Sequence, residues 1–190
     1  LASVPDSRKK ECKTSRGRKV FDGGGIDPDI AIATDETPAI IPALFNGGFL
    51  FDFATQYALK HAAIAPASEF RLSATDYQEF VQWMQDKTYT YTSPLEVALQ
   101  TLEKQAAAEK NADDIRPELK ALRKNLEESR KKDLFTYREQ ITAYLEEEIV
   151  ARYYLEKGMT EVGFQRDAEL KKAIELLADS RQYRKILNLN

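Results

Sequence analysis

Residues 134–154 read LFTYREQITAYLEEEIVARYY and carry the clearest structural signal in the chain. Apolar side chains recur along them at steps of three and four, at Leu134, Tyr137, Ile141, Leu145, Ile149 and Tyr153. This spacing places the side chains on one side of an α-helix. The pattern extends upstream through Leu119, Leu122 and Leu126. The sequence therefore predicts one long helix, or two in tandem, over residues 114–157, ended by Gly158.

The apolar side of this long helix is expected to form the centre of a helical domain. It should be buried against helices at residues 48–63 and 167–187. The positions expected to be buried are Leu134, Ile141, Leu145 and Ile149. The opposite side should face water, and it carries Glu139, Glu146 and Glu147.

Helix start and stop signals surround this region. Thr37 before Pro38 predicts a helix to about Phe45, stopped by Asn46-Gly47-Gly48. Two capping boxes predict further helix starts, one from Ser73 to Asp76 and one from Ser93 to Glu96, the second with Pro94 at the first helical position. Apolar periodicity adds helices at about 48–63 and 167–187. The fold class is therefore mainly α.

The first 34 residues differ in composition from the rest. Residues 11–14 and 18–21 are suited to strands, and Ser15-Arg16-Gly17 to the turn between them. Ile30 and Ile32 alternate with smaller residues and predict a further short strand. A hairpin of this size is too small to be stable alone, so we expect it to pair with something.

Bulk composition narrows the possible functions. The chain has 190 residues, of which 43% are hydrophobic and 31% charged, as is typical of a globular protein. A net charge of −3 gives no reason to expect nucleic acid or an anionic membrane as a partner. No run of about 18 apolar residues predicts a membrane-spanning segment. Cys12, the single cysteine, cannot form an internal disulfide.

Four patterns could carry chemistry, and each has a simpler interpretation. Gly23-Gly24-Gly25 lacks the spacing of a phosphate-binding loop and is more typical of a turn. His61, the only histidine, fits a helix end or packing role better than a catalytic one. Consecutive glutamates at 127–128 and 146–148 point in different directions from a helix and do not converge on one ion. The basic residues of 8–19 have only Phe21 as a nearby aromatic, which disfavours RNA. We nominate no catalytic, cofactor-binding or metal-ligating residue, and expect no cofactor.

One stretch resembles a known family. Residues 13–30 read KTSRGRKVFDGGGIDPDI. They resemble the K-T-x-x-G-R-x-V-x-x-G-G-G-I-x-P-D-I run of tail-specific (carboxy-terminal processing) serine peptidases, in the form found in Bacteroidetes-like bacteria. The resemblance continues through Phe53-Ala54-x-x-Tyr57 with His61, Phe80-x-x-x-Met84, Glu148-Ile149-x-x-Arg152-Tyr153-Tyr154, and Asp167-x-Glu169-x-x-x-Ala173-Ile174-x-x-Leu177.

The resemblance implies a division of the chain and a parent activity. Residues 1–34 would be the terminal β-segment of a peptidase core, and residues 35–190 a helical C-terminal domain. Family members cut exported proteins near their C-terminus with a Ser nucleophile and a Lys base, and both residues lie upstream of the run. No serine of this chain matches that motif, so the chain is expected to be a non-catalytic portion that begins within a longer, periplasmic or cell-envelope protein.

The expected partners follow from the same resemblance. They are the upstream protease core of the same parent chain, protein or peptide substrates of the parent, and possibly a second copy through self-association. The alternative is a free-standing helical protein-interaction module without hydrolytic activity. An upstream reading frame that encodes a PDZ-like segment and a Ser/Lys pair would favour the first interpretation over the second.

Overall fold

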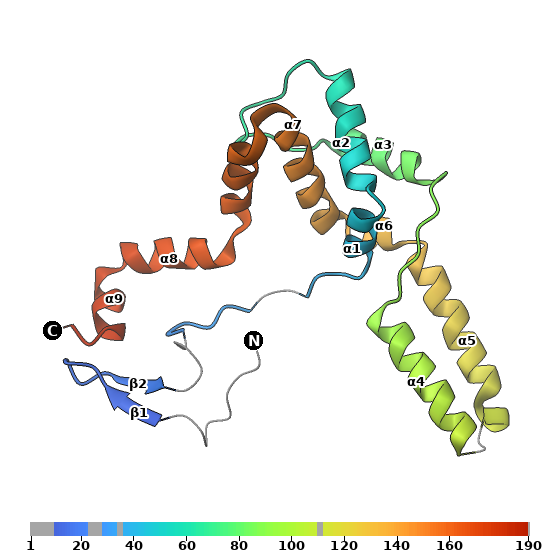
Figure 1. The fold of residues 1–190 in the computed structure, drawn as a ribbon, viewed down its shortest axis with the longest axis horizontal. Helices are drawn as coiled ribbons and strands as arrows, with labels where there is room; N and C mark the ends of the chain where they lie inside the picture. The colour runs from blue at the N-terminus through green and yellow to red at the C-terminus, as the bar shows by residue number, and fades with distance from the viewer. Residues whose placement is uncertain (1–9, 23–27, 34–35, 110–111, 190) are drawn as a thin grey trace. The chain divides into compact units, whose positions relative to one another are not determined.

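A computed structural model describes residues 10–22, 28–33, 36–109 and 112–189. Within these residues it contains two strands and nine helices (Figure 1). They are β1 (Lys10–Lys13), β2 (Lys19–Asp22), α1 (Ile40–Asn46), α2 (Phe49–Lys60), α3 (Ala74–Met84), α4 (Pro94–Ala108), α5 (Ala112–Arg130), α6 (Asp133–Thr136), α7 (Arg138–Arg166), α8 (Ala168–Ala178) and α9 (Ser180–Ile186). The prediction of a mainly α fold with a small N-terminal hairpin is confirmed.

Residue contacts divide the chain into two compact units. The central unit is Glu36–Gly163, and the terminal unit combines Leu1–Asp35 with Phe164–Asn190. The expected boundary between residues 34 and 35 concerns the architecture of a parent protein and stays a prediction.

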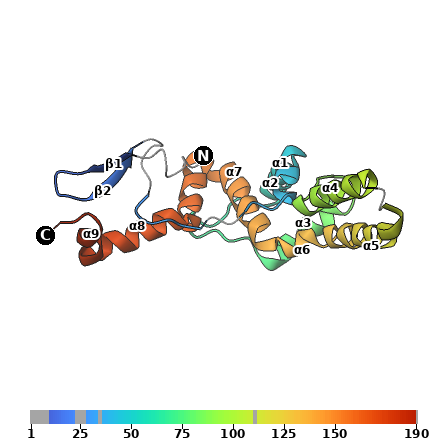
Figure 2. The same ribbon diagram turned by 90° about the horizontal axis from the view of Figure 1, so that it is seen from below.

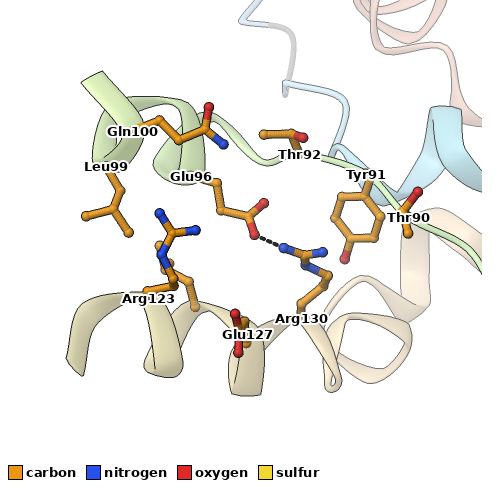
Figure 3. A pocket seen from close by; sticks show the side chains of 10 residues that line it. Thr90, Tyr91, Thr92, Glu96, Leu99, Gln100, Arg123, Glu127 and Arg130 are labelled. Carbon is orange, nitrogen blue, oxygen red and sulfur yellow. Dashed lines mark ion pairs between the residues drawn. The ribbon is translucent and has the colours of Figure 1, made fainter. Parts of the chain in front are cut away.

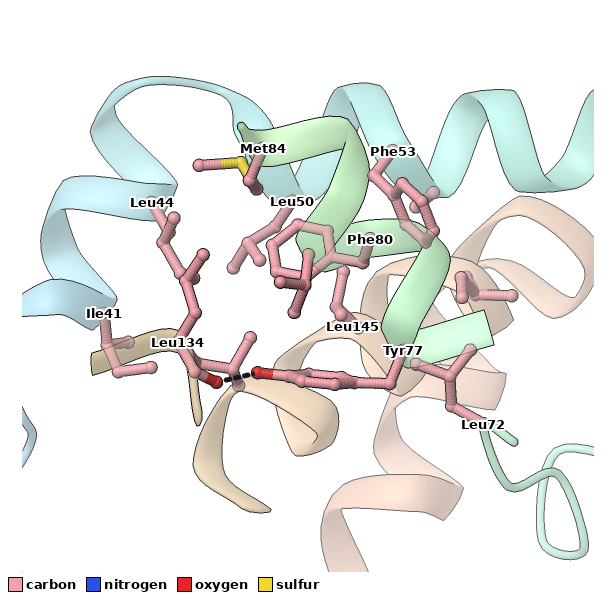
Figure 4. Packing of buried hydrophobic residues seen from close by; sticks show 14 of the residues in the cluster. Ile41, Leu44, Leu50, Phe53, Leu72, Tyr77, Phe80, Met84, Leu134 and Leu145 are labelled. Atoms are coloured by element: carbon pink, nitrogen blue, oxygen red, sulfur yellow. Dashed lines mark hydrogen bonds between the residues drawn. The ribbon is translucent and has the colours of Figure 1, made fainter. Parts of the chain in front are cut away.

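The core of the central unit is built by α1, α2, α3, α6 and α7. Figure 4 shows Phe80 of α3 between Leu50 of α2 and Leu145 of α7, with further aromatic and aliphatic side chains around them. The Tyr77 hydroxyl is buried among these groups and donates a hydrogen bond to the Leu134 carbonyl at 2.5 Å. A single apolar cluster therefore joins segments that are far apart in the sequence.

Both predicted capping boxes are present. The Ser73 and Ser93 side chains accept from the backbone N–H three residues on, and Asp76 and Glu96 accept in return from the cap N–H groups. The first helix begins later than predicted, at Ile40, and Thr37 does not cap it. The reason is that Ile41 N–H donates to the Pro38 carbonyl at 2.9 Å, so a tighter turn precedes the helix. Its predicted end is confirmed, and Gly48, with a φ of +71°, is the N-cap residue before α2.

The region predicted as one or two long helices contains α5, α6 and most of α7. The predicted stop at Gly158 is wrong, because the break lies at Leu155, whose φ of 55° and ψ of −153° are not helical. The chain turns sharply there (Figure 1). Gly158 lies beyond the turn, where a Cβ would approach Val150 Cγ1 to 2.7 Å and Tyr154 Cβ more closely still. Glycine at 158 thus lets the two arms of α7 pack together.

The predicted apolar stripe is buried, and α2, one of its two predicted partners, packs against it. Its members Leu134, Ile141, Leu145 and Ile149 all belong to the central cluster. They pack with α1, α2 and α3. Residues 167–187 belong to the terminal unit, and the expected contact with them stays a prediction. Glu139 is exposed as expected, whereas Glu146 is only 2% exposed, which corrects the prediction that it faces water.

In the terminal unit, β1 and β2 form the predicted antiparallel hairpin, in which Glu11 pairs with Phe21 and Cys12 with Val20. Gly17 supplies the left-handed turn with a φ of +78°. Ile30 and Ile32 do not form the predicted strand. They line an apolar groove of about 280 Å³ together with Leu176 and Ile186 from α8 and α9. The apolar side chains that suggested a strand therefore line this groove instead.

We expect Leu145→Ala to lower the free energy of unfolding by about 2–5 kcal/mol, because the side chain is fully buried in the cluster and its removal leaves a cavity. Leu59→Ala is the matched control: Leu59 is 84% exposed in the same unit, and its replacement should change stability by less than about 0.5 kcal/mol. Equilibrium urea unfolding measures both. Equal, small effects of the two substitutions would contradict the packing.

Gly158→Ala should destabilise the protein by about 1–3 kcal/mol, because the new methyl group overlaps Val150 and Tyr154. Gly163→Ala, in the same helix with open space around the new Cβ, should instead be neutral or stabilising by up to about 1 kcal/mol, the ordinary effect of alanine in a helix. Thermal and urea unfolding of both variants compare these signs. A stabilising Gly158→Ala would contradict the close approach of the two arms.

Candidate functional site

His61 has structural contacts rather than catalytic ones. It follows α2 at its C-terminal cap, and its Nδ1 lies 2.9 Å from the Tyr57 carbonyl. Its ring stacks on Tyr57 with centroids 4.0 Å apart. The backbone carbonyl of His61 accepts a hydrogen bond from the Tyr153 hydroxyl at 2.6 Å. These contacts fit the helix-end interpretation of this histidine. The glycine triplet 23–25 lies outside the described residues.

The consecutive glutamates diverge, as the helix geometry predicts. Glu146 points inward, and its Oε1 accepts a hydrogen bond from the Leu72 N–H at 2.7 Å. Glu148 pairs with Arg152 at 2.7 Å, and Glu128 lies 3.8 Å from Lys124. In the described part of the chain, no group of three or more His, Cys, Asp or Glu residues is placed to hold a metal ion.

Arg152 joins α7 to α2. Its guanidinium donates to the Phe51 carbonyl at 2.9 Å and lies 4.1 Å from the centroid of the Phe51 ring. The same guanidinium also donates to the Glu148 carboxylate, so it bonds to α2 and to its own helix α7 at once. The i, i+4 spacing of Glu148 and Arg152 indicates their ion pair. Nothing in the sequence indicated the contact of Arg152 with Phe51, which lies 101 residues away.

A polar pocket of about 380 Å³ lies where α4 and α5 meet the segment before α4 (Figure 3). Figures 1 and 2 show α4 and α5 side by side and running in opposite directions. The lining residues are Thr90, Tyr91, Thr92, Glu96, Leu99, Gln100, Arg123, Leu126, Glu127 and Arg130. Sequence reasoning did not bring these residues together, because the pocket depends on the hairpin formed by the two helices.

The charged groups of the pocket are largely engaged with one another. Arg130 forms an ion pair with Glu96, and its guanidinium lies 5.4 Å from the centroid of the Tyr91 ring. Glu96 also accepts from the Ser93 N–H at 2.7 Å, so it caps α4 and anchors Arg130 together. Arg123 donates to both carboxylate oxygens of Glu103, at 2.8 and 2.6 Å. These ion pairs hold α4 and α5 in register.

The Tyr91 hydroxyl donates a hydrogen bond to the Asp133 carboxylate. Burial raises the pKa of Tyr91, and the hydrogen bond and negative charge of Asp133 raise it further. The neutral phenol acts here as a hydrogen-bond donor to Asp133. The contacts of Tyr91 thus tie the segment before α4 to α6.

The described residues form a mainly helical fold. A family model, "Probable PDZ-protease, C-terminal helical domain", matches residues 40–177, and the chain belongs to this family. No curated protein and no solved structure matches the chain. The family match confirms the expectation of a protease C-terminal region. The Bacteroidetes-like, tail-specific form of that protease stays a prediction.

Within the described residues, no helix is both long enough and apolar enough to cross a bilayer.

The hydrogen bond of Tyr91 predicts a pH dependence of stability. In the unfolded chain the phenol ionises near its usual pKa of 10.0, while in the folded state the pKa is raised. The stabilising contribution of Tyr91 is therefore complete below about pH 10 and is lost as the pH rises further. Urea unfolding between about pH 9 and about pH 11 should show a steeper loss for the wild type than for Tyr91→Phe. Parallel profiles for the two proteins would contradict the assigned hydrogen bond.

Proposed function

We propose that this chain is the non-catalytic C-terminal portion of a serine-type carboxy-terminal processing peptidase. Its parent would act in the periplasm or cell envelope and cleave exported proteins near their C-terminus. The nucleophile, the base and the PDZ-like substrate domain would lie upstream in the parent chain. This chain would contribute a β-hairpin to the peptidase core and a helical domain beside it.

The observation that carries the proposal is the order of two signatures along the chain. The run at residues 13–30 resembles the segment that closes the core in tail-specific peptidases, and the helical domain of the PDZ-protease family follows at residues 40–177. The structure gives part of that run a physical reason. Arg18 and Asp29, both motif positions, form an ion pair at 3.0 Å, so the G-R and P-D parts of the run hold together.

The hairpin supports attachment to a larger sheet. The residues of β1 are all exposed, and only Val20 of β2 is partly covered. A two-stranded hairpin is marginally stable by itself, and its free strand edges can pair with another strand. The upstream core of the parent would supply that strand. The helical domain would then pack on the core or shape the access of protein and peptide substrates.

The alternative is a free-standing helical interaction module. It is favoured by the central unit, which buries an apolar cluster of its own between residues 40 and 162. The coding sequence upstream of Leu1 separates the two proposals. A frame that encodes a PDZ-like segment and a Ser/Lys pair supports the peptidase, and a start codon close by supports the module.

The purified chain should not hydrolyse unstructured peptides that carry a free C-terminus, because the proposed nucleophile and base lie upstream. The parent protein should cleave the same peptides, and replacement of its upstream serine by alanine should abolish the cleavage. A continuous assay with quenched fluorescent peptides measures all three proteins. Turnover by the chain alone that disappears when one of its own serines is replaced would contradict the proposal.

A further inference from the structure

Residues 179–189 lie beyond the part of the chain that the family model matches, which ends at residue 177. They comprise the cap of α9, the helix itself and the three residues that follow it. Residue contacts group them with β1 and β2 in the terminal unit, although the two segments are far apart in the sequence. The family match assigns these residues no role, so their contacts in the terminal unit are the guide to what they do.

Asp179 redirects the chain between α8 and α9. It is the residue after the last turn of α8, and its Oδ1 accepts hydrogen bonds from two backbone N–H groups of α9, at 3.1 and 3.0 Å. Such an acidic cap satisfies donors that have no partner within the helix. Figure 1 shows the chain turning at this point. After the turn, Ile186 of α9 lines the same apolar groove as Leu176 of α8.

The helix α9 ends in a Schellman motif at Asn188. The Leu189 N–H donates to the Arg184 carbonyl at 2.8 Å, and the Asn188 N–H donates to the Lys185 carbonyl at 3.2 Å. Asn188 has a φ of +53°, the left-handed conformation that this motif needs. Glycine is the usual residue at such a position, and asparagine is the next most common. The backbone alone therefore does not explain why the side chain is an amide.

The side chain of Asn188 contacts the β-hairpin. Its Nδ2 donates a hydrogen bond to the Arg16 carbonyl at 2.8 Å. Arg16 lies in the turn between β1 and β2, where the Gly17 N–H donates to the Thr14 carbonyl at 2.9 Å. The Thr14 N–H in turn donates to the Arg18 carbonyl at 2.9 Å and closes the hairpin beside the turn. The cap of α9 is thus bonded to the hairpin where its two strands meet.

A second contact lies at the other end of the run at residues 13–30. Ile30 lines the apolar groove together with Leu176 and Ile186, so this end of the run meets α8 and α9 through apolar side chains. Between the two contacts, the Arg18 guanidinium forms an ion pair with Asp29 at 3.0 Å. The run is therefore attached to the C-terminal helices twice, by a hydrogen bond at its turn and by apolar contact at Ile30.

We propose that residues 179–189 are a positioning segment, which orders the hairpin and holds it for pairing with the peptidase core. The hairpin needs such support, because two strands alone are marginally stable and the residues of β1 and β2 are nearly all exposed. The ordering of the hairpin stands on the contacts within this chain. The pairing with the core rests on the proposed function, and there the peptidase would depend on residues that are far from its upstream nucleophile and base.

The first test is amide hydrogen exchange of the full 190-residue chain, measured by NMR. The Thr14 N–H reports the hairpin, and the Ile149 N–H within α7 reports the central unit. A variant that stops at Ala178 should exchange the Thr14 N–H about tenfold faster or more, with the Ile149 rate unchanged. A Thr14 N–H that is unprotected in the wild type, or equally protected in the shortened variant, would overturn the proposal.

Asn188→Gly separates the hydrogen bond from the helix cap. Glycine keeps the left-handed end of α9 but cannot donate to the hairpin turn, so the Thr14 N–H should exchange about two- to tenfold faster. Gln182→Ala is the matched control, because it removes an exposed side-chain amide from the same helix and should leave the rate as in the wild type. If Asn188 only capped α9, Asn188→Gly would match the wild type, and the proposed role of its side chain would be wrong.

The second test uses the parent peptidase with the same substitutions and a quenched fluorescent peptide. Asn188→Gly should lower kcat by about two- to tenfold and leave KM nearly unchanged, because the proposed substrate-binding domain lies upstream. Gln182→Ala should leave both constants as in the wild type. Full activity of a parent that stops at Ala178 would overturn the positioning role and leave the proposed function intact. A parent that is inactive at full length would contradict the proposed function instead, and the exchange rates of the chain would still decide whether residues 179–189 order the hairpin.

Discussion

Burial of the α7 stripe is the interaction on which the central unit depends. Ile141, Leu145 and Ile149 are fully buried, and the helices that cover them, α1 to α3, come from a segment more than fifty residues upstream. None of these three short helices has enough residues to be stable alone, since isolated helices shorter than about 12–15 residues are marginal in water. The stripe therefore turns separate helices into one core, and the polar contacts are arranged around it.

Glu146 shows how strongly this core constrains polar groups. Its neighbours Leu145 and Ile149 direct that part of α7 inward, and its carboxylate is taken out of water with them. A buried carboxylate is tolerated when it receives hydrogen bonds. The Leu72 N–H supplies one at 2.7 Å, directly before the cap of α3 at Ser73. Glu146 thereby ties the entry of α3 to α7 and links the capping box to the core.

The accuracy of the sequence predictions depended on how local each signal was. The capping boxes at Ser73 and Ser93 were predictable because all their partners lie within three residues. The strand predicted from the alternation of Ile30 and Ile32 does not form, because a strand also needs a neighbouring strand to share its hydrogen bonds. The break at Leu155 and the burial of Glu146 were not predictable, because each depends on contacts that form only in the folded chain. The polar pocket was not predictable for the same reason, because only the folded hairpin of α4 and α5 shows which of their positions meet.

Two exposed surfaces of the described residues differ in chemistry. The edges of β1 and β2 offer backbone hydrogen bonds, which suit a strand and carry little information about side chains. The α4–α5 hairpin carries exposed leucines around a cavity of about 200 Å³, beside the ion pairs that join its two helices. Under the proposed function, the strand edges would join this chain to the peptidase core, and the chain would need no reacting group of its own. Its contribution would then be to determine where the catalytic part is held and what lies beside it.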